Sequence, residues 1–207
     1  REELRAALDE FATDPEMRVG ILTGAGRAFS AGADLKEMTD LYGTLASLTE
    51  EQRIEGYRGN QPFGRNPKPF IAAVNGLAIG AGMERATDCD IRIASDQAHM
   101  AETFVRRGLI PADGSCWQLP RMIGLGNTLL MQYTGDVMDA SEALRLGIVS
   151  KVTSHETLMS TTMELAERLA SVATYSMAMT KRLVQTSLNE GFGEGMRLAA
   201  LAQDIAR

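Results

Sequence analysis

Two glycine-rich passages, at residues 24–36 and 76–84, contain the groups of this sequence that are best suited to chemistry. Each passage follows a short apolar run and precedes a helical pattern, and its small residues leave backbone N–H groups uncovered. A helix that begins at such a passage adds positive partial charge at its N-terminus. Two passages lying side by side would aim two N–H donors at one oxygen atom, which is the arrangement of an oxyanion hole.

Two other interpretations of these passages stay open at this point. A glycine-rich turn between a strand and a helix is most often ordinary structure. A dinucleotide-binding loop also competes, because residues 23–26 read Thr-Gly-Ala-Gly after a strand pattern and residues 80–82 supply a Gly-x-Gly. Neither passage continues as Gly-x-Gly-x-x-Gly, since the sixth positions hold Phe29 and Arg85.

The elements around these passages predict an α/β chain that ends in helices. Apolar runs predict buried strands, and three amphipathic segments at 155–171, 174–189 and 193–206 follow one another without a strand between them. The length of 207 residues, with 44% hydrophobic and 23% charged residues, indicates one globular domain. The predicted strands lie at 19–23, 70–74, 90–94 and 148–152.

Composition excludes several classes of function. The net charge of −6 gives the chain no general attraction to nucleic acid. No run of about 18 apolar residues predicts a membrane span. Cys89 and Cys116 are too few for a disulfide framework and have no metal-site spacing, so we expect a reducing, cytoplasmic setting and no metal.

Seven passages along the chain stand in one characteristic order: residues 28–38, 69–76, 80–84, 88–94, 108–111, 119–121 and 142–149. In this order and spacing they resemble the enoyl-CoA hydratase/isomerase (crotonase) superfamily. The resemblance implies a crotonase (ClpP-like) fold, an α/β spiral of β-β-α units with a helical C-terminal segment. It implies a crotonase core at 1–152, lacking the N-terminal strands of relatives, and a helical trimerisation segment at 153–207. We therefore expect a chain that is incomplete at both ends.

The resemblance also implies catalytic roles. In this family two backbone N–H groups hold the thioester oxygen, and the matching positions are Ala33 and Ala81. Glu84 stands at the position of a catalytic carboxylate, although a solvated helix carboxylate is the plainer alternative. Phe104 stands where hydratases carry a second glutamate, and a phenyl ring cannot transfer a proton. The nearby carboxylates are Glu102 and Asp113.

Glu102 and Asp113 therefore become candidate assistants to Glu84, and Glu102 has the alternative of pairing with Arg106 at i,i+4. The resemblance places coenzyme A, as part of the substrate, against one group of residues, with Lys68 as a weaker candidate. A second group lines the acyl pocket, for which core packing is an equal alternative. The first group is Arg27, Ala31, Leu35 and Lys36, and the second is Met38, Met83 and Phe104.

The function that the resemblance implies is an acyl-CoA enzyme of fatty acid metabolism that stabilises a thioester enolate. Hydration of a 2-enoyl-CoA (a lyase reaction) and double-bond isomerisation are the expected reactions. Dehalogenation, decarboxylation, ring opening and a CoA-binding pseudo-enzyme remain alternatives because position 104 lacks a carboxylate. We expect no separate cofactor, no nucleic-acid or membrane partner, and a homotrimer or a dimer of trimers (hexamer).

Overall fold

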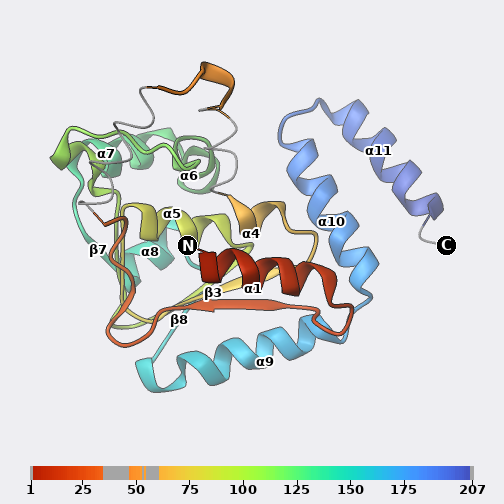
Figure 1. The fold of residues 1–207 in the computed structure, drawn as a ribbon, viewed down its shortest axis with the longest axis horizontal. Helices are drawn as coiled ribbons and strands as arrows, with labels where there is room; N and C mark the ends of the chain where they lie inside the picture. Colours follow the sequence, from red (N-terminus) through yellow and green to blue (C-terminus); the bar gives the residue numbers. More distant parts are fainter. Residues whose placement is uncertain (1, 35–46, 53, 55–60, 206–207) are drawn as a thin grey trace.

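The fold is a spiral in which the strands from β1 to β6 alternate between two sheets. The computed structural model describes residues 2–34, 47–52, 54 and 61–205 (Figure 1). The first sheet is parallel, in the order β1 (Gly20–Thr23), β3 (Phe70–Val74), β5 (Ile91–Ser95) and β8 (Lys151–Thr153). The second has the order β2 (Ala28–Ser30), β4 (Leu77–Ile79), β6 (His99–Ala101) and β7 (Met138–Asp139), with only β7 antiparallel. The predicted spiral of β-β-α units is confirmed.

The apolar runs located the first sheet and missed the second. Strands β1, β3 and β5 agree with the predicted runs at 19–23, 70–74 and 90–94 to within one residue. The run at 148–152 was placed too early, because Ile148 and Val149 are core residues and strand pairing begins at Lys151. The strands of the second sheet are only two or three residues long, too short to show a period of two.

Strand β3 lies between two layers of helices, and its side chains pack alternately against one layer and the other. Phe70 and Val74 belong to the main core cluster, together with Phe11 of α1 (Glu2–Thr13). Ile71 and Ala73 belong to a second cluster with residues of α9 (Leu158–Ala170). Figure 1 shows α1 and α9 on opposite faces of this sheet. The all-apolar sequence of β3 therefore reflects burial on both faces.

Among the remaining elements of the body, α5 packs on β2 and β4 of the second sheet, and α6 packs on α5. Thr103–Arg107 forms a 3-10 helix, η1, and His155–Thr157 forms another, η2. The α-helices of this part are α4 (Pro62–Arg65), α5 (Ala81–Asp88), α6 (Ser115–Ile123), α7 (Leu125–Thr134) and α8 (Ala140–Leu146).

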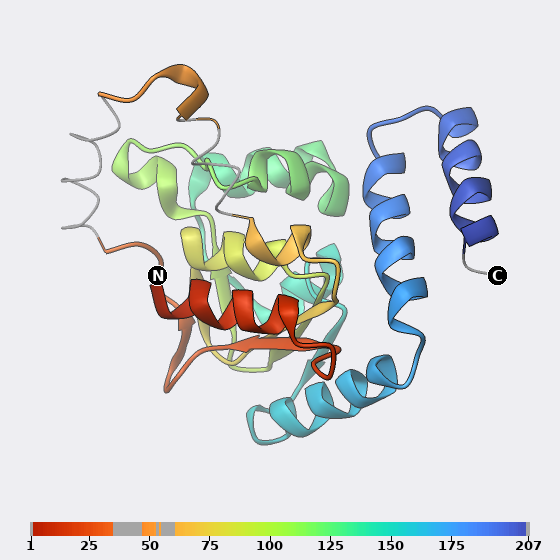
Figure 2. The same cartoon turned by 45° about the vertical axis from the view of Figure 1, so that its right-hand side comes forward.

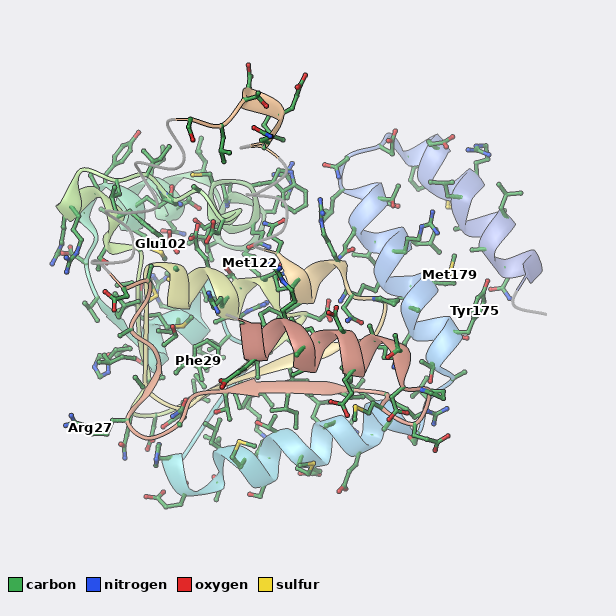
Figure 3. The ribbon with its side chains drawn as sticks, viewed as in Figure 1. Arg27, Phe29, Glu102, Met122, Tyr175 and Met179 are labelled. Carbon is green, nitrogen blue, oxygen red and sulfur yellow. The ribbon has the colours of Figure 1, made fainter. Side chains whose placement is uncertain are left out.

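Two C-terminal helices, α10 (Thr174–Ser187) and α11 (Phe192–Ile205), stand beside the body as a pair (Figure 2). Their outer faces expose apolar side chains, and Figure 3 shows Tyr175 and Met179 of α10 at this side of the molecule. Among the helices that the structure describes, none is long and apolar enough to cross a membrane. The exposed apolar residues of this pair include Tyr175, Val184, Leu188, Phe192, Met196 and Leu201.

Candidate active site

The two glycine-rich passages lie against each other, which is the condition that an oxyanion hole requires. Strand β2 of the first passage pairs in parallel with β4 of the second. A Cβ atom at Gly82 would lie 2.2 Å from the carbonyl oxygen of Ser30, so only glycine permits this approach. Gly32 has a φ of 98°, and a Cβ atom there would lie 2.9 Å from the carbonyl oxygen of Ile79. The passages are thus joined backbone to backbone.

This contact brings Ala33 and Ala81 into one neighbourhood. Ala81 is the first residue of α5, so its N–H has no carbonyl partner within the helix. The preceding Gly80, with a φ of 55°, caps the helix and turns the chain into it. A Cβ atom built on Gly32, the neighbour of Ala33, would lie 3.8 Å from the nitrogen of Ala81. The two alanines that the resemblance selected therefore come from adjoining segments.

Glu84 lies one turn into α5 from Ala81, and only 2% of it is exposed. Its Oε1 atom accepts a hydrogen bond from the backbone N–H of Asp113, at 3.1 Å. Burial, together with the negative charge of Asp113, raises the pKa of Glu84 to about 7. A carboxyl with a pKa near neutrality can both accept and donate a proton at physiological pH.

Glu102 is the second buried carboxyl of the site, and it is connected to Glu84 through Ser115. The Ser115 Oγ atom lies 2.9 Å from Glu84 Oε1 and 3.0 Å from Glu102 Oε2. Glu102 is fully buried, and burial raises its pKa to about 8, with the charge of Glu84 adding to the effect. In Figure 3 Glu102 lies beside the layer of helices that contains α6 and α7.

The alternative pairing of Glu102 with Arg106 is wrong. Glu102 follows β6 and is the N-cap residue of η1, and its side chain is buried, whereas Arg106 is exposed and binds Asp136. Sequence reasoning missed Ser115 altogether. The available signal was its position directly after Gly114, at the first turn of a helix, where serine commonly makes polar contacts.

Phe104 lies beside the start of α5. A Cβ atom on Gly80 would be 3.6 Å from the Cζ atom of the Phe104 ring, so the ring lies next to the residue that precedes the Ala81 N–H. Phe104 is half-buried. At this position the chain therefore presents an apolar wall and no proton-transfer group.

The remaining candidate residues for catalysis, coenzyme A binding and the acyl pocket do not gather at one place in the structure. Asp113 contributes its backbone N–H to Glu84, and its carbonyl accepts a hydrogen bond from Gln61. Arg27 and Ala31 are exposed, and Arg27 extends from the loop between β1 and β2 at the edge of the molecule (Figure 3). Met83 is fully buried in the main core cluster, which favours its packing role. Leu35, Lys36 and Met38 lie outside the described residues.

Lys68, the weaker coenzyme A candidate, has a structural role. Its side chain is buried, and its Nζ atom donates hydrogen bonds to the carbonyl oxygens of Phe11 and Asp14. An ammonium group that closes the C-terminal end of α1 in this way is not available to an anionic ligand.

Comparison with known proteins places these features in a family. The family described as enoyl-CoA hydratase/isomerase matches residues 1–200 of the chain. The chain belongs to this family. Among curated members, the short-chain-enoyl-CoA hydratase of Clostridium acetobutylicum is 37% identical over 93% of this chain and 77% of that protein.

Solved structures of the enoyl-CoA hydratase/isomerase family have the same fold. An enoyl-CoA hydratase subunit from Geobacillus kaustophilus is 36% identical, with a TM-score of 0.88 over 99% of this chain and 77% of the other. A monofunctional enoyl-CoA isomerase from M. smegmatis is 32% identical, with a TM-score of 0.75 over 94% and 82%. The crotonase fold is thereby confirmed, and it replaces the dinucleotide-binding interpretation of the glycine-rich passages.

Proposed function

We propose that this chain is an acyl-CoA enzyme that forms a thioester enolate, using the N–H groups of Ala33 and Ala81 as an oxyanion hole and Glu84 as the base. Negative charge grows on the thioester oxygen when a proton leaves the adjacent carbon or when a nucleophile adds to the conjugated double bond. Preorganised donors at that oxygen contribute about 3–4 kcal/mol each in comparable sites.

One observation carries this proposal: Glu84 is a buried carboxyl with a pKa near 7, one helical turn from Ala81, whose N–H is the first of α5. A thioester oxygen bound at Ala81 would place the carbons of the acyl group beside the Glu84 carboxylate. The positive end of α5 would also stabilise the enolate oxygen. A solvated helix carboxylate, the plainer alternative, does not describe a side chain that is 2% exposed.

Two reactions of this kind have separate support. Double-bond isomerisation needs a single base that moves a proton between two carbons, and it agrees with an apolar Phe104 beside the oxyanion donors. Hydration of a 2-enoyl-CoA agrees with the name of the relative from Clostridium acetobutylicum. Both pass through the same enolate, so Glu84, Ala33 and Ala81 have the same roles in each.

The accessory assignments belong to the same proposal. Coenzyme A would contact Arg27, Ala31, Leu35 and Lys36, and the acyl chain would pass Met38 and Phe104. The apolar outer face of α10 and α11 would be covered in a homotrimer or a dimer of trimers, with residues 153–207 as the trimerisation segment. The two free thiols, Cys89 and Cys116, agree with a reducing cytoplasmic location.

A substrate panel tests the function. The purified chain is mixed with 2-enoyl-CoA and 3-enoyl-CoA thioesters of several lengths, and the conjugated double bond is followed by its ultraviolet absorbance. Loss of absorbance reports hydration, and gain reports isomerisation. Glu84→Gln should lower kcat by about 10²–10⁴ while KM changes little, because proton transfer is lost and binding is kept.

Glu164→Gln is the matched control, since Glu164 is an exposed carboxylate on α9 away from the site. It should retain wild-type turnover. If no acyl-CoA binds in calorimetry, or if Glu84→Gln turns over every bound thioester at the wild-type rate, the proposed function is overturned.

A further inference from the structure

We propose that Glu84, Ser115 and Glu102 form one proton-holding unit, in which Glu102 stores a proton and delivers it to Glu84 through the Ser115 hydroxyl. Glu102 thereby supplies the second carboxyl of the site from a position two residues before Phe104. The inference rests on the proposed function only in assigning the proton to acyl-CoA chemistry. The unit itself is a property of the buried contacts.

The contacts of Ser115 Oγ require a proton on one of the two carboxyls. A hydroxyl has one hydrogen to donate and two lone pairs that accept. Ser115 Oγ has three polar neighbours: Glu84 Oε1 at 2.9 Å, Glu102 Oε2 at 3.0 Å and the amide Nε2 of Gln132 at 3.5 Å. The amide can only donate. If both carboxyls were ionised, two acceptors would face a single hydroxyl hydrogen, and one contact would be repulsive.

The surroundings place that proton on Glu102. Glu84 Oε1 already accepts the N–H of Asp113, which favours the ionised form of Glu84. Glu102 Oε1 is buried, and no described residue donates a hydrogen bond to it. A charge there would be desolvated and uncompensated, so the neutral acid is the stable form. The chain of donation then runs from Glu102 to Ser115 to Glu84, and every contact of Ser115 Oγ is satisfied.

The ionisable groups around the unit agree with this direction. Asp113 and Glu84 both raise the pKa of Glu102, after burial, and burial also raises the pKa of the nearby Cys116 thiol. Among the described residues, no Lys, Arg or His is a cause of the pKa shift of either glutamate. The site has excess negative charge and no countercharge from the described residues. The lowest-energy state is therefore one in which the two glutamates share a proton.

The proton movement balances without a further reactant. The Glu102 O–H bond breaks as its proton passes to Ser115 Oγ, while the Ser115 hydrogen passes to Glu84 Oε1. The net change is one proton moved from Glu102 to Glu84, with no change in oxidation state. In this unit Glu102 reaches Glu84 through Ser115, and it acts as a positioning and storage residue behind Glu84.

Infrared spectroscopy of the wild-type enzyme tests the stored proton without substrate. At a pH between about 7 and about 8, the pKa values of the two glutamates, a carboxyl C=O stretch of a protonated acid should be present and should shift on 13C-glutamate labelling. It should be lost in Glu102→Gln and retained in Asp88→Asn, which removes another buried carboxyl outside the unit. Absence of the band in the labelled wild-type enzyme overturns the proposal.

Kinetics tests delivery of the proton. Glu102→Gln keeps an N–H donor toward Ser115 but has no proton to give, so kcat should fall about 100-fold with KM nearly unchanged, and the alkaline limb of the pH profile should disappear. Ser115→Ala should produce the same loss, and the double variant should be no worse than either single one. Unchanged kcat and an unchanged alkaline limb in both variants overturn the delivery step.

Failure of this proposal and failure of the proposed function give different results. If no acyl-CoA is turned over, the proposed function falls, and the infrared band alone decides whether the proton is stored. If turnover is normal and Glu84-dependent but the band is absent, the proposed function stands and the proton-holding unit is wrong.

Discussion

Lys181 Nζ lies 2.8 Å from Asp90 Oδ2, and this ion pair ties α10 to the start of strand β5. The same Nζ donates to the carbonyl oxygens of Phe63 and Lys68, at 2.9 and 3.4 Å. Asp90 Oδ2 also accepts the backbone N–H of Phe70. Four segments of the chain therefore meet at one largely buried ammonium group.

Replacing Lys181 should loosen the C-terminal helices. Lys181→Met leaves Asp90 without its countercharge and removes a donor from each of two carbonyls, so we expect the free energy of unfolding to fall by about 2–3 kcal/mol. Chemical denaturation measures this change. Lys151→Met, at an exposed position on β8, is the control and should change stability by about 0.5 kcal/mol or less. Equal effects of the two substitutions would contradict the role of Lys181.

Gly82→Ala should damage the fold at the junction of the two glycine-rich passages. The new methyl group would lie 2.2 Å from the Ser30 carbonyl oxygen, which is backbone and cannot turn away. We expect a loss of about 2–3 kcal/mol in the free energy of unfolding, together with lost turnover, because overpacking displaces α5. Gly126→Ala is the matched control in α7: its Cβ meets nothing within 4 Å, and it should stabilise the chain by about 0.5–1 kcal/mol.

Arg92→Lys should be destabilising despite the conserved charge. The buried guanidinium donates from Nη1 to the carbonyl oxygens of Cys89, at 2.6 Å, and Thr87, at 3.3 Å, at the C-terminal end of α5, and from Nε to the carbonyl oxygen of Ile148, at 2.5 Å. A lysine cannot reproduce this fork, so the melting temperature and kcat should both fall, since α5 carries Glu84. Arg145→Lys, on an exposed ion pair with Glu142, should leave both unchanged within error. A wild-type melting temperature for Arg92→Lys would contradict this account.

Stability should fall as pH rises through the neutral range. In the unfolded chain Glu84 and Glu102 ionise near 4.5, whereas in the folded chain their pKa values are about 7 and about 8. Between these limits the folded state binds more protons than the unfolded state, so the free energy of unfolding decreases with pH. The contribution is fully present below about pH 4.5 and is lost above about pH 8.

Glu102→Gln removes one of these ionisations. The melting temperature of the variant relative to wild type should therefore be higher at about pH 8 than at about pH 5. Glu164→Gln, at an exposed position, should give no such trend. A difference between Glu102→Gln and wild type that does not vary with pH would mean that Glu102 is ionised throughout.

Phe104→Ala should change substrate preference more than chemistry. Removing the ring beside Gly80 opens space next to the oxyanion donors, so kcat/KM should rise for bulky acyl-CoA thioesters relative to the four-carbon one, by about 10-fold. Leu109→Ala, in the turn that follows η1, serves as a control for nonspecific loosening. An unchanged ratio of kcat/KM values for Phe104→Ala would show that the ring does not line the acyl site.

Local sequence determined most of the first sheet and the terminal helices. Strand β3 is an uninterrupted apolar run because both of its faces are buried, and such a run can be recognised from the sequence alone. The second sheet could not be predicted from the sequence, because strands such as β4 have only three residues and β4 lies between glycines. Its existence depends on pairing with β2 and β6, which are distant in sequence.

For the candidate site, the family resemblance selected Glu84, Ala33 and Ala81 from their positions, and the tertiary structure decided which carboxyl accompanies Glu84. Glu102 and Asp113 were equal candidates in the sequence. The inward turn between β6 and η1 directs Glu102 to Ser115, while Asp113 presents its backbone N–H. Burial and hydrogen-bond partners set the protonation of a carboxyl, and both are properties of distant segments brought together, which no local pattern contains.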